Sequence, residues 1–318
     1  MKGSLIVSAA ATLSGTAARG GALDWPKPQG SRLLWPAGAP GLLGAAPREE
    51  ITERSKDDQH KDRAITGIAA PRIDVFPAAK PNGASVLLIP GGGYARIAFD
   101  REGYEMAAWF NARGITAFVL FYRLPAEGWA DAANVPLADA QRAVRLIRTH
   151  ATEYAIDPAK LIVMGFSAGG HLCADLAGRF AASVHTLVDA ADTASARPNL
   201  VAPIYPVVSL TPPIAHGGSR TNLLGAHPTP GAEAAHAADR HISPDTPPCF
   251  VVHAMDDPVV PVDNSLLLLA ALRKAGVRCE AHLFEKGGHG FAMRNAVGLP
   301  AHVWPELFMN WAAPKLGL

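Results

Sequence analysis

The sequence predicts one α/β domain built around a doubly wound, mostly parallel β-sheet. Short apolar runs, which suit strands buried on both faces, alternate along the chain with segments of helical periodicity. That alternation is typical of parallel strands joined by crossover helices. Of the 318 residues, 49% are hydrophobic and 18% are charged, so the chain can bury a large core. The length suits one large domain better than two small ones.

The expected elements follow one another as strand, helix, strand through most of the chain. Apolar runs predict strands at 72–76, 84–89, 115–122, 161–166, 200–205, 249–254 and 279–284. Helical periodicity predicts helices at 101–113, 137–149, 168–180, 264–274 and 303–311. The stretch from about 207 to 247 is rich in His, Pro and Gly. We expect it to be a loop-like insertion that serves as a lid beyond the carboxyl end of a strand.

The beginning of the chain predicts export. Residues 1–22 combine Lys2, an Ala-rich apolar run and small residues that allow cleavage near Ala18 or Ala22, which is the pattern of a secretory signal peptide. The apolar run is too short to span a bilayer. A flexible Ala/Gly tail is the alternative. We expect a periplasmic or extracellular protein, with an irregular arm over 23–64, anchored by Trp25 and Trp35, and the main domain over 65–318.

Charge and cysteine usage exclude several classes of partner. The formal net charge is +1, and Lys and Arg are scattered, so we expect no nucleic-acid or membrane partner. Cys173, Cys249 and Cys279 lie far apart in apolar segments without C-x-x-C spacing. They are expected to be buried free thiols, with one disulfide as the alternative. No metal-ligand spacing occurs, and the predicted chemistry needs no cofactor. The residues favour no particular oligomeric state.

The motif Gly165-Phe-Ser167-Ala-Gly169 indicates a nucleophile. This G-x-S-x-G lies between an apolar strand and a helix, which is the context that the motif requires. A sharp strand-to-helix turn exposes Ser167 above the sheet, and the helix N-terminus supplies free N–H groups and a positive dipole end. The alternative, a simple strand-to-helix turn, explains the flanking residues less well.

A serine hydroxyl needs a base, and the base needs a carboxylate to orient it. Triads built on this kind of turn have the acid and then the histidine later in the chain. Asp256 and Asp257 directly follow the strand 249–254, and His289 lies between glycines in the loop after the last strand. We favour Asp257 over Asp256 because the sequence from Asp257 to Pro261 matches the pattern D-x-x-V-P. Some relatives of this fold have the acid after the strand that corresponds to 200–205, but no Asp or Glu follows that strand here until Glu233.

An oxyanion needs fixed hydrogen-bond donors, each contributing on the order of 10²–10³ in rate. The backbone N–H groups of Gly92, Gly93 and Ala168 are the candidates, because Pro90-Gly-Gly-Gly-Tyr94 follows a central strand. The alternative is a tight glycine turn without a ligand. Tyr94 is a candidate substrate-binding residue, although packing on the loop is an equal alternative.

Other polar residues favour structural roles. We expect His171, one turn into the helix after Ser167, to be a structural hydrogen-bonding residue, and Arg123 to form a structural ion pair. The insertion carries His216, His227, His236 and His241 without the clustered spacing of a metal site.

The chain resembles the bacterial acetyl xylan esterase-like members of the α/β-hydrolase superfamily, which are secreted polysaccharide-deacetylating esterases. The motifs that carry the resemblance span about residues 34–291. They are Leu34-Trp-Pro36, Ala39-Pro-Gly41, Pro90-Gly-Gly-Gly-Tyr94, Asp139-Ala-Gln-Arg-Ala143, Gly165-Phe-Ser-Ala-Gly-Gly-His171, Asn222-Leu-Leu-Gly225, Asp257-Pro-Val-Val-Pro261 with Asn264-Ser265, and Gly288-His-Gly290. The hormone-sensitive-lipase branch is disfavoured, because it has His where this chain has Pro90.

The resemblance implies a secreted serine esterase that removes acetyl groups from a carbohydrate such as acetylated xylan, with Ser167, Asp257 and His289 as its triad. A broad-specificity short-chain carboxylesterase is the first alternative. A peptidase on the same fold is disfavoured, since such enzymes carry a large extra domain. A non-catalytic binding protein on this scaffold is also disfavoured, because all three triad residues are present in order.

Overall fold

A single mixed sheet forms the centre of the protein, seen in a computed structural model that describes residues 27–57 and 60–318. Its eight strands lie in the order β1-β4-β6-β5-β7-β8-β9-β10. The strands are β1 (Gly30–Leu33), β4 (Arg72–Phe76), β5 (Ser85–Ile89), β6 (Thr116–Phe121), β7 (Leu161–Phe166), β8 (Leu200–Ile204), β9 (Cys249–Ala254) and β10 (Cys279–Phe284). The strands from β6 to β10 in this order run parallel, whereas β1 and β4 run antiparallel to their neighbours. The predicted doubly wound, mostly parallel sheet is confirmed.

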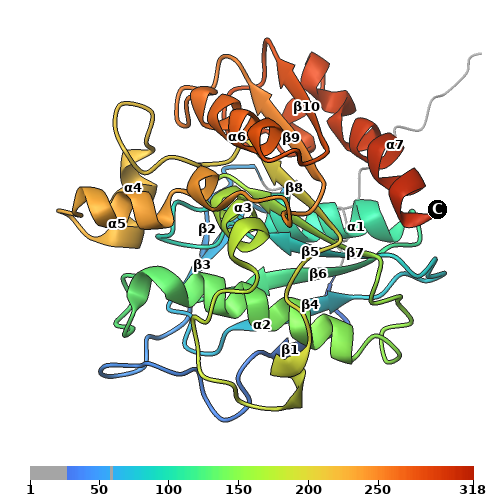
Figure 1. Ribbon diagram of the computed structural model, residues 1–318. Coiled ribbons are helices and arrows are strands. Elements are labelled where there is room, and N and C mark those ends of the chain that lie inside the picture. The colour runs from blue at the N-terminus through green and yellow to red at the C-terminus, as the bar shows by residue number, and fades with distance from the viewer. Residues whose placement is uncertain (1–26, 58–59) are drawn as a thin grey trace, which may run out of the picture.

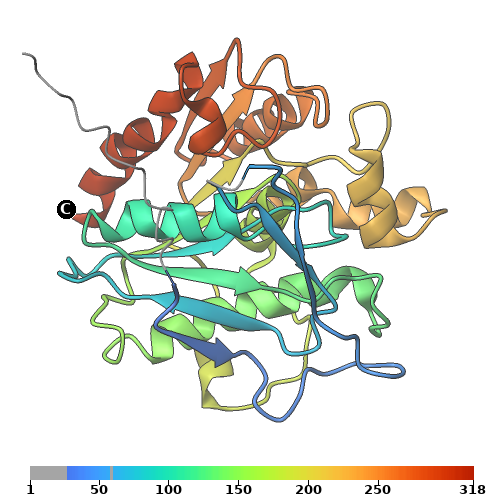
Figure 2. The same cartoon turned by 180° about the vertical axis from the view of Figure 1, so that it is seen from behind.

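Helices cover both faces of this sheet. They are α1 (Glu105–Asn111), α2 (Val135–Thr149), α3 (Ala168–Arg179), α6 (Asp263–Lys274) and α7 (Trp304–Leu316). Figure 1 shows α2, α3 and α6 on one face, and Figure 2 shows α1 and α7 on the opposite face. Strands β5, β6, β7, β8 and β9 are buried along their whole length, so their side chains form the core on both sides.

The predicted strands and helices agree with the observed ones to within a few residues. The closing helix, expected to end at 311, continues to Leu316. The helix expected from residue 101 begins with a π-helical turn at Asp100–Tyr104 before α1. Such turns are frequent at functional sites, because they reposition side chains within a helix. Here the turn directs Arg101 and Glu102 toward the loops described below.

The arm predicted as irregular over 23–64 is more ordered than expected. Residues 30–33 form β1, which extends the main sheet, and β2 (Glu50–Glu53) pairs antiparallel with β3 (Arg63–Thr66). All three strands are only four residues long, and β1 and β2 are mostly exposed, so they lack the alternating pattern that marks a strand in a sequence. Trp35 is buried, as predicted for an anchor, while Trp25 and the predicted signal segment 1–22 lie outside the described residues.

The insertion at 207–247 is not loop-like, because it contains two short helices. Figure 1 shows α4 (Gly217–Leu224) and α5 (Pro230–His236) side by side at one edge of the molecule, followed by a 3₁₀ turn at Ala238–His241. Each helix begins with a side-chain cap, from His216 in α4 and from Thr229 in α5. The Thr-Pro pair at the start of α5 is a sequence signal for a helix that the analysis missed.

The structural ion pair predicted for Arg123 is formed with Asp139 and ties the arm to the core. Both side chains are buried, and the guanidinium donates to the carboxylate from Nε and Nη2. The indole N–H of Trp35 donates to the same carboxylate over 2.7 Å, and Arg123 also donates to the Pro40 carbonyl over 2.6 Å. These bonds satisfy a buried charge that would otherwise be costly.

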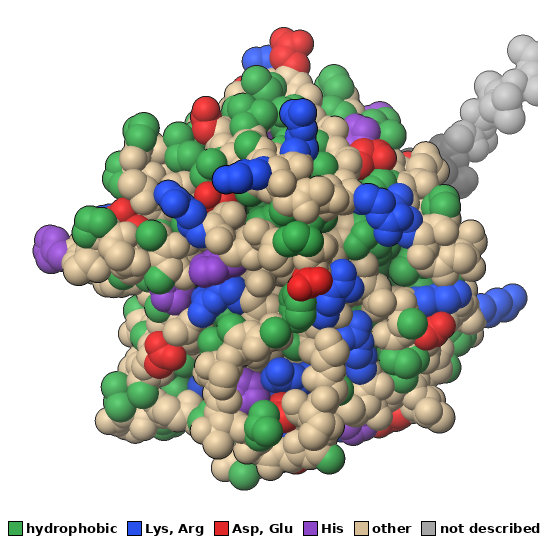
Figure 3. Space-filling view, in the orientation of Figure 1, with side chains coloured by type: hydrophobic (Ala, Val, Ile, Leu, Met, Phe, Trp, Pro, Cys, Tyr) green, Lys and Arg blue, Asp and Glu red, His purple; other side chains and the backbone are tan. Residues whose placement is uncertain are grey.

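The cysteines and the surface also agree with the sequence. All three cysteines are free thiols, as expected; Cys173 and Cys249 are buried, whereas Cys279 is only partly buried. Burial raises the pKa of Cys173 to about 12. Figure 3 shows Lys, Arg, Asp and Glu side chains spread over one face among apolar ones. Among the described residues, no helix is both long and apolar enough to cross a lipid bilayer.

Asp139→Asn should lower the free energy of unfolding by about 3–5 kcal/mol, because it leaves the Arg123 guanidinium buried without its counter-charge. Glu306→Gln is a matched control, since it removes an exposed ion pair with Arg113 and should cost at most about 1 kcal/mol. Urea unfolding followed by circular dichroism measures both. Equal losses in the two variants would contradict a special role for the buried pair.

Candidate active site

Ser167 lies at the turn between β7 and α3 in a strained backbone conformation. Its φ of 55° and ψ of −117° are disfavoured for an L-amino acid. Backbone hydrogen bonds hold it there: its N–H donates to the Ile204 carbonyl over 3.0 Å, and its carbonyl accepts from Val207 over 3.1 Å. The residue is only 7% exposed, and its hydroxyl makes no cap hydrogen bond to the helix that follows.

The two glycines that flank Ser167 are required by close backbone contacts. A Cβ at Gly165 would lie 2.1 Å from the Gly169 carbonyl oxygen. A Cβ at Gly169 would lie 2.1 Å from the Ile89 carbonyl oxygen at the end of β5. No side chain fits at either position. The turn, the helix and the neighbouring strand therefore pack directly backbone to backbone.

The structure brings together the three residues predicted as a triad. The Ser167 hydroxyl lies 2.9 Å from Nε2 of His289, and Nδ1 of the same ring lies 2.7 Å from Oδ2 of Asp257. The distances permit a continuous hydrogen-bonded path from the hydroxyl to the carboxylate. In this arrangement the imidazole can take the serine proton while the carboxylate fixes its tautomer.

The Asp257 carboxylate is held in its ionised form. Burial raises the pKa of Asp257, but hydrogen bonds from His253 and His289 outweigh this effect. The pKa of Asp257 therefore lies well below the usual range. Its other oxygen accepts from the backbone N–H groups of Val259 and Val260. His253 is fully buried on β9, where its Nε2 lies 3.2 Å from the carboxylate and its Nδ1 lies 2.7 Å from the Ser265 hydroxyl. The sequence analysis did not single out His253.

Asp256 does not contact His289, but it fixes the loop on which His289 lies. One of its oxygens accepts hydrogen bonds of 2.9 Å from the N–H groups of both Gly287 and Gly288. The hydrogen bond from Gly288 is the main cause that lowers the pKa of Asp256. The choice of Asp257 over Asp256 as the partner of the histidine therefore agrees with the geometry, and Asp256 caps the adjacent loop.

Backbone donors lie where the sequence predicts an oxyanion site. Ala168 is the first residue of α3, so its N–H has no partner within the helix. Among the described residues, no hydrogen-bond acceptor occupies the N–H groups of Gly92 or Gly93 either. The loop lies against the serine turn, because a Cβ on Gly91 would lie 2.9 Å from Cβ of Ser167. Together these groups can stabilise negative charge next to Ser167.

A buried carboxylate fixes this glycine loop, and the sequence analysis missed it. Oε2 of Glu102 accepts from the Gly91 N–H over 2.7 Å, and Oε1 accepts from the Tyr205 hydroxyl over 2.9 Å. The Tyr205 ring in turn packs edge-on against His289, with 5.3 Å between the ring centroids. Arg101, the neighbour of Glu102, donates to the Gly290 carbonyl over 3.1 Å. The π-helical turn thus supports both the glycine loop and the histidine loop.

Tyr94, proposed as a substrate-binding residue, packs on the loop instead. Its side chain is buried, and its hydroxyl lies 2.8 Å from Nδ1 of His171. Nε2 of His171 lies 2.8 Å from the His236 carbonyl, so His171 has the structural role that was predicted. Tyr94 has a φ of 60°, and its side chain is part of the hydrophobic core.

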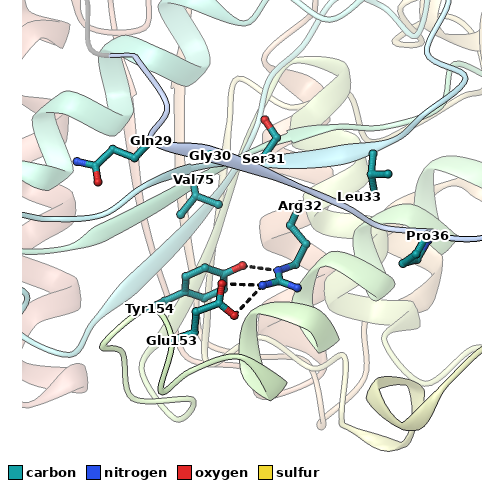
Figure 4. Close-up of a pocket in the computed structure, with 9 residues that line it drawn as sticks. All are labelled: Gln29, Gly30, Ser31, Arg32, Leu33, Pro36, Val75, Glu153 and Tyr154. Carbon is teal, nitrogen blue, oxygen red and sulfur yellow. Dashed lines mark hydrogen bonds and ion pairs between the residues drawn. The ribbon is translucent and has the colours of Figure 1, made fainter.

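A groove elsewhere on the surface is not connected with this chemistry. Figure 4 shows a cavity of about 440 Å³ beside β1, where Arg32 is hydrogen-bonded to Tyr154 and Glu153. Strand β1 is four positions from β7 in the sheet, which corresponds to about 19 Å at the usual strand spacing. Within residues 27–57 and 60–318, no cluster of three metal-ligating side chains occurs.

Comparison with known proteins relates the chain to a family of hydrolases. A family model described as BD-FAE matches residues 73–272. The chain is 38% identical over 233 residues to endo-1,4-beta-xylanase B of Butyrivibrio fibrisolvens, covering 73% of this chain and 35% of the relative. It is 32% identical over 220 residues to an acetylxylan esterase of Xylanibacter ruminicola, covering 68% of this chain and 42% of the relative. The chain thus spans less than half the length of either relative.

Solved structures give the same relationship. An acetyl ester-xyloside bifunctional hydrolase from Caldicellulosiruptor lactoaceticus superposes with a TM-score of 0.71 at 36% identity, over 78% of this chain and 89% of that protein. A thermophilic esterase from the Planctomycetes species Thermogutta terrifontis has a TM-score of 0.64 at 25% identity, over 83% and 91%.

A fluorophosphonate probe should label Ser167, because His289 and Asp257 activate its hydroxyl. Asp257→Asn should slow labelling by about 10⁴-fold, since the amide cannot hold the required tautomer. Asp256→Asn should slow it by less than about tenfold, because its amide oxygen still accepts from the loop and a neutral hydrogen bond is weaker by only about 1 kcal/mol. Mass spectrometry identifies the modified residue. The reverse ranking of the two variants would contradict the assignment of the acid.

Proposed function

Because the chain belongs to the BD-FAE family and has the α/β-hydrolase fold, we propose that it is a serine esterase that removes acetyl groups from a carbohydrate such as acetylated xylan. It is a carboxylic ester hydrolase in which Ser167, His289 and Asp257 act as the triad. The observation that carries the proposal is the hydrogen-bonded path between these residues, with distances of 2.9 and 2.7 Å.

The proposed reaction proceeds through an acyl-enzyme. Ser167 attacks the ester carbonyl while His289 accepts its proton, and the ionised Asp257 stabilises the imidazolium. The N–H groups of Ala168 and the glycine loop bind the oxyanion. The alcohol then leaves with the proton from His289, and water hydrolyses the acetyl-enzyme by the same steps. No cofactor is required by this sequence of steps.

The relatives support the carbohydrate part of the proposal. The names of two of them refer to acetylated xylan or xylosides, and another refers to xylanase activity. The charge of this chain fits a neutral substrate, since its formal net charge is +1. We therefore expect an acetylated xylan or xylo-oligosaccharide to be the ester that is cleaved.

Ser167→Ala should lower kcat for p-nitrophenyl acetate by about 10⁴–10⁶ while the circular dichroism spectrum stays unchanged. Wild-type enzyme should release acetate from acetylated xylan, as measured by an enzyme-coupled acetate assay. An enzyme that cleaves a panel of p-nitrophenyl esters but releases no acetate from xylan would instead be a broad short-chain carboxylesterase. Absence of both activities and of fluorophosphonate labelling would indicate a non-catalytic binding protein.

Export is also part of the proposal, and its support is the signal-like pattern of residues 1–22. When the full chain is expressed in a bacterial host, the mature protein should begin just after Ala18 or Ala22. N-terminal sequencing of protein from the periplasmic fraction and the medium tests this. An intact Met1 on protein confined to the cytoplasm would contradict it.

A further inference from the structure

One histidine of the insertion lies next to the glycine loop. The imidazole of His216 lies close to Gly93, since a Cβ added to Gly93 would lie 3.8 Å from Cε1 of the ring. The charged groups of His289 and Asp257 are also close enough to act on the imidazole of His216. Burial and the charge of His289 lower the pKa of His216, while Asp257 opposes them. His216 is therefore neutral at neutral pH and lies at the active site, although it is far from the triad residues in sequence.

Two asparagines fix the insertion in this position. Asn264, which is fully buried at the start of α6, accepts from the N–H groups of Val208 and Ser209 and donates to the Ile214 carbonyl over 2.8 Å. Asn222 of α4 donates to the Gly93 carbonyl over 2.8 Å. The insertion is thus bonded both to the sheet scaffold and to the glycine loop that it overlies.

The orientation of the His216 ring is fixed as well. Its Nδ1 caps α4 by accepting from the Ser219 N–H over 3.2 Å, and the fully buried Ser219 hydroxyl lies 2.8 Å from the same nitrogen. Because Nδ1 accepts a hydrogen bond from the amide, the proton of the neutral ring is on Nε2. Within the described part of the chain, Nε2 has no hydrogen-bond partner.

We propose that Nε2–H of His216 binds the alcohol part of the ester, by donating a hydrogen bond to an oxygen next to the scissile bond, such as a neighbouring sugar hydroxyl. The inference rests on the proposed esterase function and specifies one residue that selects the substrate. The ring lies next to Gly93 of the glycine loop, and this loop lies against the Ser167 turn. A donor at this point can reach an oxygen of an ester whose carbonyl is held by the glycine loop.

Two esters that differ by one hydroxyl test the proposal. trans-2-Hydroxycyclohexyl acetate carries an oxygen next to the ester, as an acetylated sugar does, and cyclohexyl acetate lacks it. A neutral hydrogen bond contributes about 0.5–1.5 kcal/mol, so wild-type enzyme should prefer the hydroxylated ester by about 3–10-fold in kcat/KM. In His216→Asn this preference should fall to about one. Asparagine keeps a helix cap, so α4 stays intact, but its side chain is too short to reach the substrate.

His227→Asn is the matched control, because His227 is an exposed histidine of the same insertion. It should retain the wild-type preference. The proposal would be overturned if wild-type enzyme showed no preference, if His216→Asn kept it, or if His216→Asn lowered kcat/KM for both esters by the same factor. If neither ester is cleaved by the wild-type enzyme, the proposed esterase function itself fails, which is a separate outcome.

Discussion

The constraint on which the site depends is the strained backbone of Ser167, held above the end of the parallel sheet. An L-residue at φ 55° and ψ −117° is unstable alone and persists only when its surroundings determine it. Here Ile204 at the end of β8 and Val207 just beyond it bind the two backbone groups of Ser167, and the glycines before and after it let α3 and β5 approach to backbone contact. The large buried sheet therefore stabilises the unfavourable backbone conformation of Ser167, the residue that carries the reacting hydroxyl.

Three carboxylates divide the task of fixing the groups around this hydroxyl. Asp257 orients the imidazole, Asp256 caps the loop that carries it, and Glu102 fixes the glycine loop through the Gly91 N–H. Each carboxylate accepts a hydrogen bond from a backbone N–H, so each fixes a catalytic or supporting side chain relative to the main chain of a loop. Such support is what keeps reacting groups within the fraction of an ångström that catalysis requires. The hydrogen bonds described for these three carboxylates do not involve the insertion. The insertion contributes a separate residue, His216, next to the glycine loop.

The sequence predicts the elements well, and the structure brings together the three residues predicted as a triad, because both predictions follow from local patterns. Buried parallel strands are continuous apolar runs, and the turn at Ser167 needs glycines at fixed positions. Glu102 was missed because its partners, Gly91 and Tyr205, come from other elements. His253 was missed because a lone histidine in an apolar strand has no pattern that marks it, although Asp257 is only four residues away. His216 was expected to have a structural role. Tyr94 was ambiguous for the same reason as Glu102: its neighbour His171 comes from another element. The short helices of the insertion were missed because each is too brief to show a periodic apolar face.

The free cysteines have a consequence for stability in an oxidising medium. Cys249 and Cys279 are register partners on adjacent strands. Cys173 and Cys249 are buried, so the native packing shields these two thiols, whereas Cys279 is only partly buried. Once the chain opens, the same thiols are free to pair wrongly. Heat inactivation in such a medium is then governed by how rarely the sheet opens, and recovery depends on a reducing agent.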